Sequence, residues 1–165
     1  MNSNFGPTVR RGIVAGLVLY LTVAAFLAGL NLLAGRSPFH TVQLLGEPLL
    51  GARPVVPGPA WHWFAGLTFN TVHLMASLLL GMAAAFLIGA AEHARRSRWV
   101  FLLLFVVGSI VVLLGLQILT AEGSWILAWR SVLSAHLAGA VTTTAYLLWS
   151  RQDREVTEEA SGPGE

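Results

Sequence analysis

Four long apolar stretches dominate this chain of 165 residues and leave little of it for anything else. Each reaches or exceeds the roughly 20 residues that an α-helix needs to cross about 30 Å of hydrocarbon. The stretches cover residues 12–33, 64–91, 99–119 and 125–149. Because a helix satisfies its own backbone hydrogen bonds in lipid, we predict an all-α fold, a four-helix transmembrane bundle in a domain of residues 1–150.

The composition agrees with a membrane protein and argues against several kinds of chemistry. The chain is 55% hydrophobic and only 11% charged, and it has no cysteine, which excludes disulfides, thiolate metal sites and a cysteine nucleophile. No carboxylate lies in the middle of a span, and no phosphate-binding glycine loop is present. We therefore predict no catalytic residues and no enzymatic activity.

Arginines at the ends of the spans predict the orientation. Basic residues at the ends of spans favour the cytoplasmic side of a membrane. Because the arginines lie at the span ends and are not gathered on one face, we expect no nucleic-acid partner. Seven arginines fall on one side and three on the other: Arg10, Arg11, Arg95, Arg96, Arg98, Arg151 and Arg154 against Arg36, Arg53 and Arg130. We expect a protein of the bacterial inner membrane with both termini in the cytoplasm.

The outer loop 34–63 and the C-terminal tail differ in character from the spans. Ser37 followed by Pro38 is typical of a helix start, and Gly46 of a helix end, so we predict a short interfacial helix in this loop. The prolines of residues 53–59 predict an extended connection. The acidic tail 151–165 has no apolar core and is predicted to be disordered.

Small residues recur every fourth position in two of the spans, and such ladders let helices approach closely in lipid. The ladders are Ser77, Gly81, Ala85 and Gly89 in the second span and Ser131, Ala135, Gly139 and Thr143 in the fourth. Besides the lipid bilayer, we expect the partners to be other membrane subunits or a second copy of the chain, bound through these ladders.

A polar stripe follows one face of the second span. Asn70, His73 and Ser77 lie on it, with glycines before and after. His136 lies in the fourth span. Polar side chains in hydrocarbon cost several kcal/mol unless they find partners, so these residues are predicted to face the inside of the bundle.

The sharpest site hypothesis is a b-type haem ligated by His73 and His136, with Arg130 near the haem propionates. Two histidines on facing helices can clamp the iron when they lie at one depth. Counting from the outer tryptophans makes them nearly level, whereas counting from the inner ends separates them by roughly 7 Å. The alternatives are that each histidine hydrogen-bonds a neighbouring helix, or that both relay protons. Arg130 would otherwise extend to the interface or pair with Glu47 or Glu122.

Histidines also occur on the outer side. His40 and His62 together with Glu47 have side chains that suit zinc or copper. Their spacing through a proline-rich loop fixes no geometry, so we predict no metal site there and interpret them as polar residues at the interface.

Three classes of function remain open. The first is a non-enzymatic interaction or accessory component of a membrane assembly. The second is a haem-binding electron-transfer protein that uses His73 and His136. The third is an oligomeric pathway for a small solute or ion.

Overall fold

The chain folds into helices throughout the part that the structure describes. The computed structural model describes residues 5–51, 58–91 and 126–160. Its elements are α1 (Phe5–Leu33), α2 (His40–Gly46), the 3-10 turn η1 (Glu47–Leu50), α3 (Pro59–Ala91) and α5 (Ile126–Ala160). The all-α prediction is confirmed.

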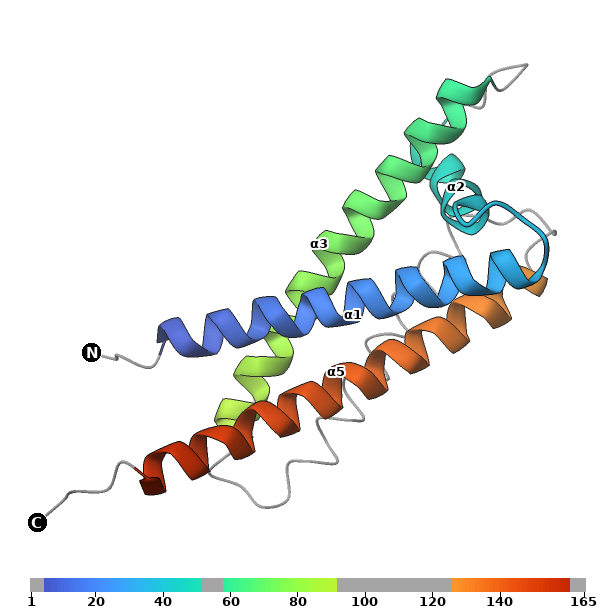
Figure 1. Ribbon diagram of the computed structural model, residues 1–165. Coiled ribbons are helices and arrows are strands. Elements are labelled where there is room, and N and C mark those ends of the chain that lie inside the picture. Colours follow the sequence, from blue (N-terminus) through green and yellow to red (C-terminus); the bar gives the residue numbers. More distant parts are fainter. Residues whose placement is uncertain (1–4, 52–57, 92–125, 161–165) are drawn as a thin grey trace, which may run out of the picture.

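The three long helices α1, α3 and α5 are each long and apolar enough to cross a membrane, as predicted for the first, second and fourth apolar stretches. The third predicted span, residues 99–119, lies outside the described residues. In Figure 1, α1 and α5 lie side by side and run in opposite directions, while α3 crosses α1 at a steep angle. The end of α3 and the start of α5 lie at opposite ends of the molecule.

The central helix of the arrangement is α1, which contacts both α3 and α5. One ridge of α1 consists of Ala15, Leu19, Val23 and Leu27, spaced four residues apart, and none of these is more than 2% exposed. Positions four apart lie one above the other on a helix, so this ridge forms a continuous apolar strip. Leu19, Val23 and Leu27 belong to the main core cluster, together with Phe69 of α3 and Val132 of α5 among others, and Ala15 belongs to a second cluster with Ala84 and Leu147.

Glycines bring the backbones of α1 and α3 into direct contact. A Cβ atom on Gly16 would lie 2.6 Å from the Cα atom of Leu78, and one on Gly81 would lie 2.5 Å from the carbonyl oxygen of Gly12. No side chain can replace hydrogen at such distances without moving a helix. The predicted ladder residue Gly81 thus packs within the chain, against a Gly12–Gly16 pair of the same four-residue spacing.

A glycine cap ends α1. Gly35 has a φ of 67°, which favours glycine because other residues meet steric strain there. The amide of Arg36 donates to the carbonyl oxygen of Asn31 at 2.8 Å, and the amide of Gly35 donates to that of Leu32 at 3.0 Å. These two bonds form a Schellman motif, which turns the chain towards α2.

Asn31 also holds the loop after α1. Its side-chain Nδ2 donates to the carbonyl oxygen of Pro38 at 3.2 Å, and the Thr41 hydroxyl donates to its Oδ1 at 2.8 Å. Asn31 and Thr41 are only 5% and 8% exposed. Because both buried polar side chains are paired, the end of α1 and the start of α2 form one unit.

The short helix predicted in the outer loop is confirmed as α2, which starts at His40 rather than at the expected Pro38. It packs on α3: the backbone of Gly46 contacts that of Ala65, and Val42 and Leu45 are buried. Gly46 is the last residue of α2, as predicted, and its lack of a side chain also permits the close approach to Ala65.

The fourth span continues beyond its predicted end. Helix α5 extends to Ala160, whereas residues 151–165 were predicted to be a disordered tail; residues 161–165 lie outside the described residues. Acidic residues follow arginines by four positions there, as in Arg151 with Glu155 and Arg154 with Glu158. Charges of opposite sign at this spacing favour helix, which explains the difference.

Candidate functional site

The structure brings His73 of α3 and His136 of α5 together in the interior. Their ring centres lie 5.7 Å apart, and the ring planes make an angle of 69°. The two histidines are therefore level, which the residue counts from the two membrane sides had left ambiguous. This contact joins α3 and α5, the two helices whose polar residues were predicted to face the inside of the bundle.

Aromatic rings surround His73. The ring of Phe69 stacks on it with centres 5.6 Å apart and an interplanar angle of 12°, and the ring of Tyr20 lies 5.5 Å away, tilted by 41°. The Tyr20 hydroxyl makes a long hydrogen bond of 3.4 Å to Oδ1 of Asn70. Three helices, α1, α3 and α5, thus contribute side chains to the site.

The hydrogen bonds of the two imidazoles differ. Nδ1 of His136 lies 2.9 Å from the carbonyl oxygen of Val132, one turn earlier in α5. Because a carbonyl only accepts, Nδ1 carries the hydrogen, and in the neutral ring Nε2 keeps its lone pair. Nε2 of His73 is buried and has no hydrogen-bond partner in the described part of the chain. A buried polar nitrogen without a partner calls for an explanation, such as an unseen ion or water.

The other residues of the predicted stripe face inward as well. Asn70 is partly buried and bonds Tyr20, while Ser77 is 1% exposed. The hydroxyls of Ser77 and of Thr143 in α5 are buried without partners among the described residues. Polar groups therefore continue along α3 and α5 beyond the histidine pair.

Arg130 lies apart from the histidines. It is six residues before His136 along α5, about 9 Å at the rise of an α-helix. Its side chain is exposed. This exposure agrees with extension to the interface, the simplest of the roles considered for it.

The outer-side histidines are separate from this site. Nδ1 of His62 lies 3.4 Å from Oε1 of Glu47, so α3 and η1 are linked by this contact. Within residues 5–51, 58–91 and 126–160, no group of three or more His, Cys, Asp or Glu side chains is placed to hold a metal ion. The structure pairs His62 with Glu47 and leaves His40 out of the pair.

Tyr20 is a site residue that the sequence analysis missed. It is a lone tyrosine in the first span, and only its four-residue distance from the small residue Gly16, at the crossing with α3, indicates that it faces the second span.

No protein-family model matches the chain, and neither the curated proteins nor the solved structures include a significant match.

Proposed function

We propose that this chain is a membrane electron carrier that binds a b-type haem between His73 and His136. The observation that carries the proposal is the contact of the two imidazoles, with ring centres 5.7 Å apart. Haem iron accepts neutral imidazole ligands from the protein, and His73 and His136 are two histidines whose rings the structure brings into contact. These two imidazoles would hold the iron of the haem, one from α3 and one from α5.

The hydrogen bonds support the same role. A metal-binding histidine commonly donates its other ring nitrogen to a backbone carbonyl, which fixes the tautomer and the ring orientation. His136 does this through Nδ1 and the Val132 carbonyl. His73 offers a buried Nε2 with no protein partner among the described residues. One ring is oriented to present a lone pair, and the other has a nitrogen that lacks a bond.

The number of ligands favours haem over a bare ion. A porphyrin occupies four positions around iron and leaves two for the protein, whereas structural zinc is held by four protein ligands. Two imidazoles are the donor set that an iron porphyrin needs. When bound, haem iron supplies reversible one-electron transfer.

The residues around the pair would give the group a largely apolar environment. Phe69 and Tyr20 lie against His73, and the rings of both would border a macrocycle there. Arg130, on the side where the outer loop lies, is the residue that we assign to the propionates. We place the protein in the bacterial inner membrane with both termini in the cytoplasm, as the arginine distribution predicts.

A role as a non-enzymatic accessory component of a membrane assembly is our second proposal. The small-residue ladders, which were expected to bind the other subunits, support this role less than expected. Gly81 packs on Gly12 and Gly16, and a Cβ on Gly139 would lie 2.7 Å from Leu19 Cδ1. Ala135 and Thr143 are fully buried. Because the ladders pack inside the chain, they leave little small-residue surface for another subunit.

An absorption spectrum of the full chain tests the haem proposal. The protein is produced with added haem precursor, purified in mild detergent, and measured oxidised and then dithionite-reduced. We expect a Soret band and sharp reduced α and β bands that disappear in both His73→Ala and His136→Ala. His40→Ala, which changes a histidine of α2 outside the pair, is the matched control and should keep the bands.

The variants must elute like the parent protein on gel filtration and keep its helical circular dichroism, so that loss of haem is not loss of fold. A colourless parent protein overturns the proposal. Bands that survive in either single variant would also refute ligation by the pair. A colourless protein that carries protons across liposomes in a His73-dependent manner would favour the relay alternative instead.

A further inference from the structure

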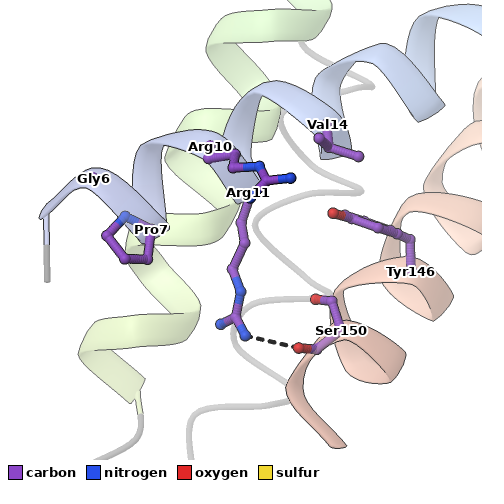
Figure 2. A pocket seen from close by; sticks show the side chains of 7 residues that line it. All are labelled: Gly6, Pro7, Arg10, Arg11, Val14, Tyr146 and Ser150. Carbon is purple, nitrogen blue, oxygen red and sulfur yellow. Dashed lines mark hydrogen bonds between the residues drawn. The ribbon is translucent and has the colours of Figure 1, made fainter. Parts of the chain in front are cut away.

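A groove lies between the first turns of α1 and the end of the membrane-spanning part of α5. Its volume is about 740 Å³, within the range of about 300–1,000 Å³ that is common for small-molecule sites. Figure 2 shows the residues that line it: Gly6, Pro7, Arg10, Arg11, Val14, Tyr146 and Ser150. Along α5, Tyr146 lies ten residues after His136, about 15 Å at the rise of an α-helix, and the proposed haem does not use the groove.

Two arginines give the groove its charge. Nη2 of Arg11 donates to the carbonyl oxygen of Ser150 at 2.7 Å, which fixes this guanidinium between the two helices. The guanidinium of Arg10 and the hydroxyl of Tyr146 point toward one another from opposite sides of the groove (Figure 2). Among the side chains that the structure describes, which do not include those of residues 151–160, neither arginine is paired with a carboxylate. The groove therefore carries the two positive charges of Arg10 and Arg11.

This set of donors matches a phosphate group. Arginine presents several N–H groups in a planar fork that fits phosphate oxygens, and a charge-assisted hydrogen bond is about twice as strong as a neutral one. The Tyr146 hydroxyl can donate a further bond. A phosphate between Arg10 and Tyr146 would connect α1 to α5 where the two side chains face each other.

The position of the groove points to lipid as the source of that phosphate. The apolar spans end here, since they cover Gly6–Leu33 in α1 and Arg130–Ser150 in α5. Headgroup phosphates lie at this level of a bilayer. Large apolar side chains near the groove are exposed on both helices, including Leu17 at 40% and Trp149 at 61%. They offer a surface along which acyl chains can pack.

We propose that the groove binds the headgroup phosphate of an anionic phospholipid at the N-terminal end of α1. Arg10 and Arg11 attract the negative charge, Arg10 and Tyr146 bond the phosphate oxygens, and the bound lipid bridges α1 and α5. This role is independent of the histidine pair and holds whether or not the protein binds haem.

Lipid binding to the full chain in non-ionic detergent, measured by native mass spectrometry, tests the proposal. Phosphatidylglycerol is titrated against the parent protein, Arg10→Gln and Tyr146→Phe. We expect Arg10→Gln to weaken binding by about fivefold, the effect of one basic residue at an anionic membrane surface, and Tyr146→Phe to weaken it less. Arg36→Gln, which removes an exposed arginine just after the other end of α1, is the matched control and should change nothing.

Further ligands separate lipid from other sources of phosphate. Phosphatidylcholine should bind more weakly than phosphatidylglycerol, and inorganic phosphate at millimolar concentration should not displace the lipid. Equal losses in Arg10→Gln and Arg36→Gln would mean attraction to overall charge and overturn the site. Undiminished binding to Arg10→Gln, equal binding of the two lipids, or displacement by free phosphate would each overturn it as well. Arg10 is substituted rather than Arg11, because Arg11 also bonds Ser150. Loss of the Arg11 side chain would disturb the contact between α1 and α5 directly.

Discussion

Substitution of Gly81 by alanine tests the backbone contact between α1 and α3. The added Cβ would meet the amide nitrogen of Gly16 and, at 2.5 Å, the carbonyl oxygen of Gly12. Both are backbone atoms, so no flexible side chain can move aside. The two helices must separate at their crossing, and contacts along the interface are lost with them.

The size of the effect follows from two opposing contributions. Forcing an extra carbon into a packed interior costs about 1–3 kcal/mol. Replacing glycine by alanine inside a helix is favourable by about 1 kcal/mol. Gly29→Ala is the matched control, because it lies in α1 and a Cβ there meets nothing within 4 Å. The propensity gain is common to both variants, so their difference isolates the steric cost of about 1–3 kcal/mol.

Reversible unfolding of the full chain measures this difference. SDS is added to the protein in mixed micelles, and loss of helix is followed by circular dichroism for the parent, Gly81→Ala and Gly29→Ala. We expect Gly29→Ala to match or exceed the parent in stability and Gly81→Ala to fall below Gly29→Ala by the calculated amount. Equal stability of the two variants would show that the crossing is not a close backbone contact.

Two further substitutions test the connection between α1 and α2 in the same assay. Asn31→Ala removes a buried side chain that bonds Thr41 and the Pro38 carbonyl. It should lower the free energy of unfolding by about 1–3 kcal/mol. A loss below about 0.5 kcal/mol, as is usual for surface changes, would contradict a buried network. Gly35→Ala forces alanine to a positive φ and should cost about 1–2 kcal/mol, so an unchanged midpoint would argue against the Schellman cap.

The long helices were predictable because the thickness of a bilayer sets a minimum length for an apolar run. The ends of these helices were less predictable. Helix α1 begins at Phe5 and α3 at Pro59, earlier than the apolar runs that start at residues 12 and 64. Hydropathy marks where lipid contact ends, whereas the hydrogen bonds of a helix continue into flanking polar residues.

The histidine pair was predictable in kind and not in geometry. Polar residues in a span indicate an inward face, so His73 and His136 could be selected from sequence. Their relative depth could not, because counting residues along two helices assumes equal tilt, and α3 crosses α1 steeply. Tyr20 and Asn31 lie in the first span, and their roles depend on partners from other segments. Such partners are known only once the helices are placed.

The contacts of α5 have a consequence for biosynthesis. The bond between Arg11 and Ser150 joins residues 139 positions apart, and the contact between His73 and His136 also needs the last helix. Chains emerge from the ribosome N-terminus first, so the glycine crossing of α1 and α3 can form while the rest is still being made. Until α5 is inserted, His73 lacks its partner ring and the groove lacks one wall. A nascent chain that stops before α5 would thus contain the glycine crossing but neither of the two proposed binding sites.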